Sequence, residues 1–254
     1  MRQIERWKKI EQMLKKEGHL SVQDLAVRLK VSEASIRRDL TKMEEERMIT
    51  RIWGGAKLID NDLDNSNLMT NNFDDKYLLR FSRNIEAKEK IGKAAAALIK
   101  DNDCVFIDAG STTLHMIDHI TAKNILVVTN GISNLQKLAA KRTNTYVPHG
   151  DLNFGSAAIM GADTSNSLDT MNFDKVFLGT ISIDAAAGCS STNSFDAALK
   201  KTAISRSKEV FILADSSKMN TRAPFSFANL EDITIITEKK PDLEHNNLRY
   251  IIAQ

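Results

Sequence analysis

The stretch that most constrains this chain is Val31–Ala56, which has the pattern of a short helix followed by a hairpin. Ser32 is a preferred helix N-cap, and Ile36, Leu40 and Met43 follow at the i, i+4, i+7 spacing of an amphipathic helix. The opposite face carries two arginines and two hydroxyl residues: Ser35, Arg37, Arg38 and Thr41. Arg bonds guanine bidentately, so this face is predicted to enter a DNA major groove. An ordinary solvated helix is the alternative.

Two short apolar runs enclose a Gly-Gly pair after this helix. Ile49–Trp53 and Ala56–Ile59 flank the pair, which predicts a β-hairpin. Its arms carry Arg51 and Lys57, which we expect to hold DNA phosphates. A reading helix followed by such a hairpin is the pattern of a winged helix-turn-helix.

Two further helices are predicted before the reading helix. Ile4–Lys16 has a helical apolar stripe, and Gly18 follows it as a C-terminal stop. Ser21–Asp24 has a capping-box pattern, with Asp in place of the usual Glu or Gln, and Leu25 and Leu29 continue the apolar side. Residues 1–59 are therefore predicted to form a winged helix-turn-helix DNA-binding domain.

Charge is distributed unevenly along the 254 residues, although the formal net charge is only +2. Residues 1–59 carry 14 Lys and Arg against nine Asp and Glu, a net charge of +5, whereas the remainder carries −3. A basic domain joined to a mildly acidic one is typical of nucleic-acid binding by the first. Residues 60–75 contain five Asp, five Asn and no Lys or Arg, which predicts an exposed linker that avoids DNA. Residues 76–254 then form the third predicted part of the chain, after the DNA-binding domain and the linker.

Several protein classes do not fit this sequence. No run approaches the ~18–20 apolar residues that span a bilayer. The N-terminus is charged throughout, without the apolar core of a signal peptide, and the two cysteines do not make a disulfide framework. We therefore expect a cytoplasmic protein that does not associate with membranes.

Residues 76–254 alternate helical patterns with short apolar runs. A helical pattern resumes at Arg83, and the runs begin near residues 104, 125, 145, 175, 209 and 233. Near-continuous apolar strands separated by helices predict an α/β domain whose parallel sheet is covered on both faces, a doubly wound arrangement.

Three of these strands end in small polar residues, and ligands bind beyond the carboxyl ends of such strands. Asp108–Thr113 leads into a helix, and its glycine and hydroxyl residues at a helix N-terminus suit a phosphate. Thr129–Gly131 and Asp215–Lys218 are the other two ends. Each motif alone predicts no more than helix capping, but three in one sheet favour a ligand site. Lys200 and Lys201 are further candidates or an ordinary solvated face.

Other chemistry is less well supported. His115 and His119 have the i, i+4 spacing of metal ligands, but no third ligand has a suitable spacing, so we expect no metal and no cofactor. Cys104 is predicted in the core, and Cys189 in a loop that exposes it. No catalytic triad, Walker loop or GxGxxG motif is present.

The motifs together resemble one family. In order they are VSEASIRRDLTKMEEERMITRIWGGA, FIDAGSTT, VVTNG, FLGTISIDAAAG and LADSSK, and this chain closely resembles the DeoR family of bacterial sugar-metabolism repressors. The resemblance implies an N-terminal winged helix-turn-helix and a C-terminal sensor similar in fold to ribose-5-phosphate isomerase and CoA transferases. It also implies operator DNA and a phosphorylated sugar as partners, and assembly as a homodimer or higher oligomer.

The same resemblance implies which residues bind the effector. Carried over by position, the phosphate would be held by Asp108, Gly110, Ser111, Thr112, Thr113 and Lys218. The sugar end would be lined by Thr129, Asn130, Asp184 and Lys200. The chain departs from the family pattern at Arg47, Trp53, His149 and Asp196.

The leading hypothesis is a transcriptional repressor whose operator binding is controlled by a phosphorylated sugar. The alternative is a sugar-phosphate isomerase with a DNA-binding head, but isomerisation commonly uses a Glu base and no Glu occurs between Glu89 and Glu209. Asp108, Asp184 or Asp196 could take that role. A third hypothesis is an oligomerisation body without a ligand.

Overall fold

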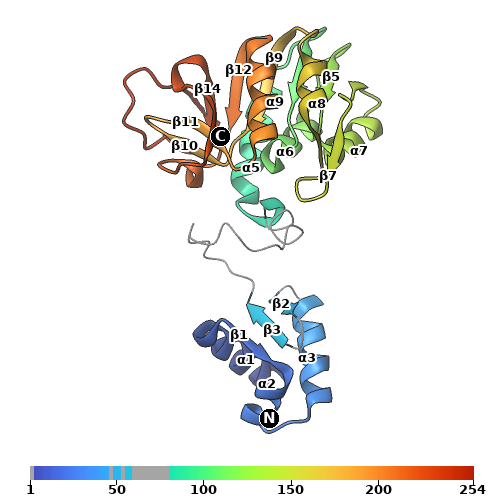
Figure 1. The fold of residues 1–254 in the computed structure, drawn as a ribbon, viewed down its shortest axis with the longest axis vertical. Coiled ribbons are helices and arrows are strands. Elements are labelled where there is room, and N and C mark those ends of the chain that lie inside the picture. Colours follow the sequence, from blue (N-terminus) through green and yellow to red (C-terminus); the bar gives the residue numbers. More distant parts are fainter. Residues whose placement is uncertain (1–2, 46–47, 53–54, 59–79) are drawn as a thin grey trace. The chain divides into compact units, whose positions relative to one another are not determined.

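The computed structural model describes residues 3–45, 48–52, 55–58 and 80–254 (Figure 1). Contacts divide the chain into two compact units, Met1–Thr70 and Asn71–Gln254. The predicted linker, 60–75, lies outside the described residues. None of the helices in the described ranges is long and apolar enough to span a membrane.

The N-terminal unit contains the expected helix-turn-helix and hairpin. Its elements are α1 (Gln3–Glu17), β1 (His19–Ser21), α2 (Val22–Leu29), α3 (Glu33–Glu45), β2 (Ile49–Ile52) and β3 (Gly55–Leu58). β2 and β3 pair antiparallel, and β1, which the sequence pattern did not predict, pairs with the other edge of β3. The small sheet contacts α1, α2 and α3 and completes a winged helix domain.

Local chemistry begins and ends these helices as predicted. The Ser21 hydroxyl accepts the backbone N–H of Asp24 at 3.0 Å, and the Ser32 hydroxyl accepts that of Ser35 at 3.3 Å. Gly18 terminates α1 with φ of +78°. Glycine adopts this left-handed conformation easily because it has no Cβ that would clash with the backbone. Lys30, at φ +53°, makes the turn between α2 and α3.

The second unit is built on one seven-stranded parallel sheet, in the order β15-β14-β12-β9-β4-β5-β6. Its strands are β4 (Cys104–Ile107), β5 (Leu126–Thr129), β6 (Asn144–Tyr146), β9 (Phe173–Gly179), β12 (Ser207–Leu213), β14 (Thr234–Thr237) and β15 (Arg249–Ile252). The six predicted apolar runs are confirmed as strands. β15 was not predicted.

Helices cover both faces of this sheet, as the doubly wound prediction requires (Figure 1). One core contains residues of α5 (Ile85–Ala96), α6 (Ser111–His119) and α7 (Ile132–Ala140). The other contains residues of α8 (Ala162–Leu168) and α9 (Ser194–Ser205).

Two smaller sheets were not predicted from the sequence. β7 (Asp151–Asn153) and β8 (Ala158–Met160) form a hairpin, and β10 (Ser182–Asp184), β11 (Gly188–Ser191) and β13 (Phe225–Ala228) form an antiparallel sheet. The expectation that Cys189 lies exposed in a loop is wrong. It is fully buried in β11, and burial raises the pKa of its thiol to about 12.

Candidate nucleic-acid interface and effector site

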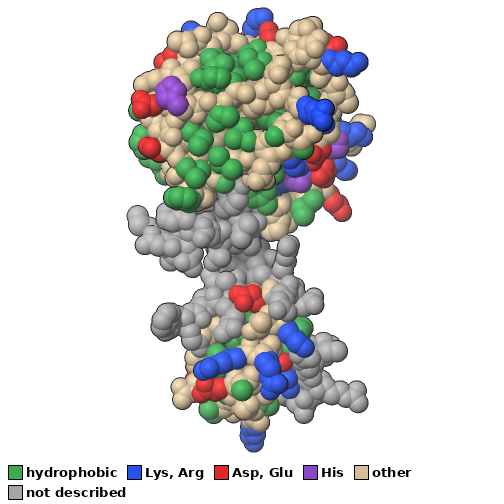
Figure 2. Space-filling view, turned by 90° about the vertical axis from the view of Figure 1, so that its right-hand side faces the viewer, with side chains coloured by type: hydrophobic (Ala, Val, Ile, Leu, Met, Phe, Trp, Pro, Cys, Tyr) green, Lys and Arg blue, Asp and Glu red, His purple; other side chains and the backbone are tan. Residues whose placement is uncertain are grey.

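The exposed face of α3 carries the residues predicted to read DNA. Ile36, Leu40 and Met43 are fully buried, which turns the opposite face of the helix outward. Arg37 and Arg38 are exposed there, and Lys and Arg side chains are prominent on this domain in Figure 2. This geometry suits a helix that enters a major groove.

Local contacts of these side chains are weak. Arg37 pairs with Glu33 at 3.0 Å across one turn, and both side chains are largely exposed. Arg38 Nε donates to the carbonyl of Ala34 at 3.3 Å, and the Thr41 hydroxyl donates to the carbonyl of Arg37 at 3.0 Å. Exposed pairs of this kind contribute only about 0.2–1 kcal/mol, so a phosphate or base can replace them at little cost. Ser35 is half-buried and lies 3.0 Å from the Ser32 hydroxyl.

A buried carboxylate holds the reading helix in place. Asp39 is 2% exposed and accepts hydrogen bonds from Arg6 and from Trp7 Nε1, the latter at 3.2 Å. Both donors come from α1, so Asp39 joins the reading helix to the first helix. Asp39 was not predicted as a structural residue, because an Asp that directly follows two arginines on a helix is typical of an exposed face.

Arg51 and Lys57 lie on the two arms of the wing. Their backbones pair with Ala56 and Thr50 respectively. Their side chains lie outside what the structure describes, so their phosphate contacts stay predictions.

In the second unit, the parallel sheet changes its direction of growth between β4 and β9. From β4 the chain adds β5 and β6 on one side and β9, β12, β14 and β15 on the other. Ligands bind beyond the carboxyl ends of the strands at such a reversal. Asp108 follows β4, and its Oδ2 accepts the backbone N–H of Gly179, the last residue of β9, at 2.8 Å. The first predicted strand end therefore lies at this reversal.

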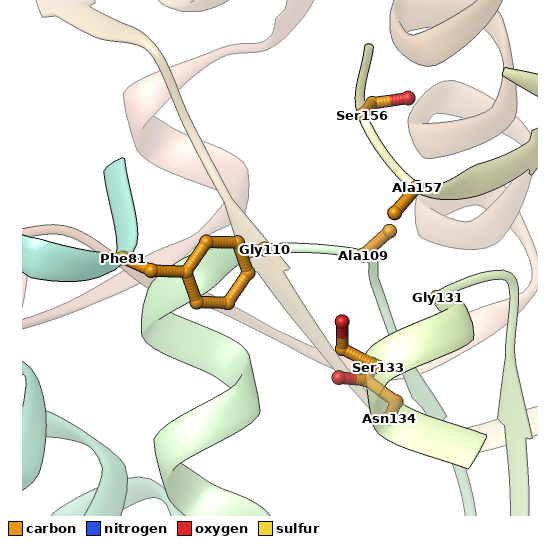
Figure 3. A pocket seen from close by; sticks show the side chains of 8 residues that line it. All are labelled: Phe81, Ala109, Gly110, Gly131, Ser133, Asn134, Ser156 and Ala157. Atoms are coloured by element: carbon orange, nitrogen blue, oxygen red, sulfur yellow. The ribbon is translucent and has the colours of Figure 1, made fainter. Parts of the chain in front are cut away.

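A small hollow lies beside Ala109 and Gly110, which follow β4, at this edge of the sheet (Figure 3). Its lining residues are Phe81, Ala109, Gly110, Gly131, Ser133, Asn134, Ser156 and Ala157. Its cavity volume is about 10 Å³, close to the space of one water molecule. Gly110 is the predicted effector residue in this lining. Phe81, Ser133, Ser156 and Ala157 had no signal in the sequence, since they come from segments outside the strand ends.

Two helix N-termini meet at this hollow. Gly110 is the N-cap of α6 and Gly131 is the N-cap of α7, and neither supplies a side chain to bond the first helix N–H groups. A Cβ on Gly131 would lie 2.9 Å from Ala109 Cα, so glycine allows the two strand-to-helix loops to approach. The positive ends of two helix dipoles that meet at one place favour an anion.

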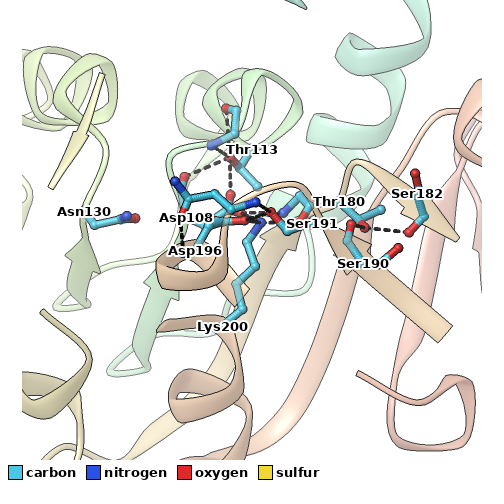
Figure 4. A network of polar contacts seen from close by, with 12 residues as sticks. Asp108, Thr113, Asn130, Thr180, Ser182, Ser190, Ser191, Asp196 and Lys200 are labelled. Atoms are coloured by element: carbon cyan, nitrogen blue, oxygen red, sulfur yellow. Dashed lines mark hydrogen bonds and ion pairs between the residues drawn. The ribbon is translucent and has the colours of Figure 1, made fainter. Parts of the chain in front are cut away.

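A buried lysine joins the elements around the reversal (Figure 4). Lys200 Nζ donates to the Gly179 carbonyl and to Asp196 Oδ2, both at 2.9 Å, and lies 3.3 Å from Asp108 Oδ2. Asp196 also accepts the Ser191 hydroxyl at 2.7 Å. Burial lowers the pKa of Lys200, but the carboxylates of Asp196 and Asp108 outweigh it and the net shift is upward. Two of these contacts are hydrogen bonds and the third is an ion pair.

Thr113 and Thr129 also bond within the protein. Thr113 Oγ1 lies 2.9 Å from Asp108 Oδ1, and Thr129 Oγ1 accepts a hydrogen bond of 2.9 Å from Asn134 Nδ2. Asn134 Nδ2 lies 2.8 Å from the Asp108 carbonyl as well, so it ties the first strand end to the second. Asn134 was not predicted as a site residue, although the sequence places it one helical turn after Gly131.

Three further predicted residues lie near the same edge. Ser111 and Thr112 begin α6, the first half-buried and the second 7% exposed. Asn130 is 1% exposed and its Nδ2 donates to the Ile159 carbonyl at 3.1 Å. Its Oδ1 accepts no hydrogen bond from any described residue. An unsatisfied buried oxygen beside Gly131 is suited to a ligand hydroxyl.

Of the ten predicted effector residues, Gly110 lines the hollow and the other nine, Lys218 and Asp184 among them, do not. Lys218 is in the 3₁₀ turn η1 (Ser216–Lys218) after β12. Asp184, on β10, accepts a 2.7 Å bond from Arg222, which lowers the pKa of its carboxyl. Asp108, Asp184 and Asp196 are all bound by internal donors, which makes each a poor general base.

A second, larger groove has a cavity volume of about 450 Å³ and lies between the β7–β8 hairpin and the starts of α8 and α9. None of the predicted effector residues lines it. Asp151 and Asp163 do, and their negative charges disfavour a phosphate.

His115 and His119 both contact Glu89 on α5, at 2.7 and 3.1 Å. Across the described ranges, no group of three or more His, Cys, Asp and Glu is placed to hold a metal ion.

Comparison with known proteins identifies both units. The DeoR-like helix-turn-helix domain matches residues 6–62, and the DeoR C-terminal sensor domain matches residues 83–239. The chain is 36% identical to the HTH-type transcriptional regulator FruR of Bacillus subtilis, over 96% of this chain and 94% of that one. It is 32% identical to the lactose phosphotransferase system repressor of Streptococcus mutans, over 95% and 94%.

A distant structural likeness accompanies these matches. Ribose 5-phosphate isomerase A from Neisseria gonorrhoeae aligns over 53% of each chain, with 17% identity and a TM-score of 0.40. This likeness is too remote to bear on chemistry. The sequence relatives and both domain matches agree: the chain belongs to the DeoR family, whose members are DNA-binding transcriptional regulators rather than enzymes.

Proposed function

We propose that this protein is a repressor of a sugar catabolic operon and that a phosphorylated sugar controls its binding to operator DNA. The observation that carries the proposal is the hollow where the N-termini of α6 and α7 meet at the reversal of the sheet. That arrangement favours a phosphate over a neutral sugar. The relative named as a lactose phosphotransferase system repressor supports sugar metabolism as the regulated process.

The predicted effector residues take two kinds of role in this proposal. Gly110, Ser111 and Thr112 bind the phosphate at the start of α6, with Lys218 as an added positive charge, and Asn130 Oδ1 accepts a sugar hydroxyl. The others shape the site through their internal bonds: Asp108, Thr113, Thr129, Asp184 and Lys200.

DNA recognition falls to the winged domain. Arg37 and Arg38 contact bases, with Ser35 and Thr41 in support, and the wing residues Arg51 and Lys57 contact phosphates. Assembly as a homodimer or higher oligomer would present paired reading helices to two operator half-sites.

A ligand screen followed by DNA binding tests the proposal. The full chain is screened by thermal shift with glucose 6-phosphate, fructose 1-phosphate, fructose 6-phosphate and ribose 5-phosphate, and with the unphosphorylated sugars. At least one phosphate should raise Tm, because a ligand of the native state stabilises it, while its parent sugar should not. No shift with any of the four contradicts the effector assignment.

Substitution of the reading arginines tests the DNA-binding half. Against a duplex selected by the full chain from a random library, Arg37→Ala and Arg38→Ala should each weaken binding by about 1–3 kcal/mol, measured by fluorescence anisotropy. Lys9→Ala, an exposed charge on α1, is the matched control and should change Kd by less than about threefold. If both arginine variants bind as tightly as wild type, α3 is not the reading helix.

A further inference from the structure

The segment Arg80–Asn84 contributes one residue, Phe81, to the lining of the candidate effector site. Arg80 is the first described residue of the sensor domain, and in chain order the segment lies between the DNA-binding domain and α5. Phe81 lines the hollow beside Gly110, and the loop at Ser156 lies on another side (Figure 3). The start of the described sensor domain, which follows the DNA-binding domain in the chain, therefore contributes a side chain to the site.

Phe81 is the one large side chain among the eight lining residues. The others are Ala, Gly, Ser and Asn. With a cavity volume of about 10 Å³, the hollow is far below the roughly 300–1,000 Å³ of ordinary ligand sites. A sugar phosphate must widen it. Ala and Gly have no side chain that could move away, and Asn134 is held by hydrogen bonds to Thr129 and to the Asp108 carbonyl. Displacement of the Phe81 ring, the Ser156 loop or both provides that space.

Hydrogen bonds tie the segment to two other loops at the same edge of the sheet. Arg80 Nη2 donates to the Gly155 carbonyl at 3.4 Å, and Gly155 precedes the lining residue Ser156. Asn84 Nδ2 donates to Asp215 Oδ1 at 2.9 Å, and Asp215 begins the turn that carries Lys218. These two hydrogen bonds couple the position of Arg80–Asn84 to the positions of both loops.

A buried lysine on α5 donates a hydrogen bond to the backbone of this segment. Lys88, on α5, is 4% exposed and its Nζ donates to the carbonyl of Arg80. The segment is thus bonded to the first turn of α5 as well as to the two loops. Hydrogen bonds therefore connect the segment to three other parts of the sensor domain.

We infer that a ligand entering the hollow displaces Phe81, and that the bonded segment Arg80–Asn84 carries this displacement toward the DNA-binding domain. The inference rests on the proposed function, since it requires a sugar phosphate in the hollow. It names Phe81 as an effector-contacting residue and Asn84 as a residue that positions the segment through Asp215.

Two substitutions in the full chain separate these roles, each tested with the phosphate from the screen that raises Tm most. Phe81→Ala removes the ring that the ligand must displace, so sugar-phosphate affinity should rise at least about fivefold and the ligand's effect on DNA affinity should fall. Asn84→Gly removes the bond to Asp215 and suits the left-handed backbone at φ +51°. It should leave sugar-phosphate affinity within about threefold, while the ligand-induced change in DNA Kd drops at least about fivefold.

Asn102→Gly is the matched control, since Asn102 is exposed, has φ of +68° and lies before β4 at the opposite edge of the sheet. It should behave as wild type. Hydrogen exchange on the wild-type chain gives a measurement without substitution: saturating sugar phosphate should change exchange in residues 80–88 and leave residues 100–104 unchanged.

The outcomes separate the two proposals. If none of the four phosphates shifts the wild-type Tm, the proposed function fails and this inference falls with it. If a phosphate binds wild type but Phe81→Ala has wild-type affinity, or Asn84→Gly keeps wild-type coupling, only the inference is wrong. Unchanged exchange in residues 80–88 at saturating ligand also overturns it.

Discussion

Replacement of Lys200 by Met tests the polar network that shapes the effector site. The ammonium group is buried between Asp196 and Asp108 and also bonds the Gly179 carbonyl. Lys200→Met leaves the buried carboxylate of Asp108 and the half-buried carboxylate of Asp196 without their cation. Removing one partner of a buried ion pair costs about 3–5 kcal/mol, which corresponds to a urea midpoint lowered by about 1.5–2.5 M for a slope near 2 kcal/mol/M.

The two tryptophans make this loss measurable in one domain. Trp7 and Trp53 both lie in residues 1–59, so their fluorescence follows the DNA-binding domain while circular dichroism also follows the sensor. Only the circular dichroism midpoint should fall. The exposed neighbour Lys201→Met is the control and should change stability by less than about 0.5 kcal/mol.

A further substitution checks the electrostatic cause. Adding Asp196→Asn to Lys200→Met removes one of the two unpaired carboxylates, so part of the lost stability should return. A Lys200→Met midpoint within 0.5 M of wild type, roughly 1 kcal/mol at this slope, would refute the reasoning.

Three other predictions follow from buried polar groups. Asp39→Ala should lower the tryptophan-monitored free energy of unfolding by about 2–3 kcal/mol, because Arg6 and Trp7 lose their acceptor; an unchanged midpoint would contradict it. Burial lowers the pKa of Lys88 to about 8 despite nearby Asp215, so the unfolded chain binds more protons between that value and 10.5. Wild type should therefore gain stability over Lys88→Met as pH rises from 8 to 10.5, in paired denaturation curves. Cys189, with its thiol pKa raised to about 12, should resist iodoacetamide at pH 8 until urea unfolds the sensor, as mass spectrometry would show.

Periodicity predicted the elements whose burial depends on apolar side chains. The stripe Ile36, Leu40 and Met43 is fully buried in α3, and the six apolar runs became six of the seven strands of the parallel sheet. The environment of such segments can be predicted from their own sequence, because the spacing of the apolar residues shows which face is buried.

Elements buried for other reasons were missed. Gly188–Ser191 is buried at every position but contains Gly, Cys and Ser, so it has no apolar signature. The edge strand Arg249–Ile252 was missed although Tyr and Ile favour strands; it is only four residues long and largely exposed. Short polar strands form here because neighbouring strands supply hydrogen-bond partners, which local sequence does not reveal.

The candidate site was predicted in part for the same reason. The strand ends at Gly110 and Gly131 were visible as turn residues after apolar runs. Phe81 and Ser156 were not, since they reach the hollow from distant segments of the chain. The burial of Lys200 also depends on tertiary structure: its neighbour Lys201 looks equivalent in sequence but is exposed.

The most direct test of the account is the DNA affinity of the full chain with and without a sugar phosphate. Fluorescence anisotropy with the selected duplex at low ionic strength, where phosphate contacts are strongest, gives both Kd values. The account predicts tight binding and at least about a fivefold change in Kd with one of the sugar phosphates, but none with its unphosphorylated sugar. Absence of DNA binding, or conversion of the sugar phosphate into another during the titration, would contradict it.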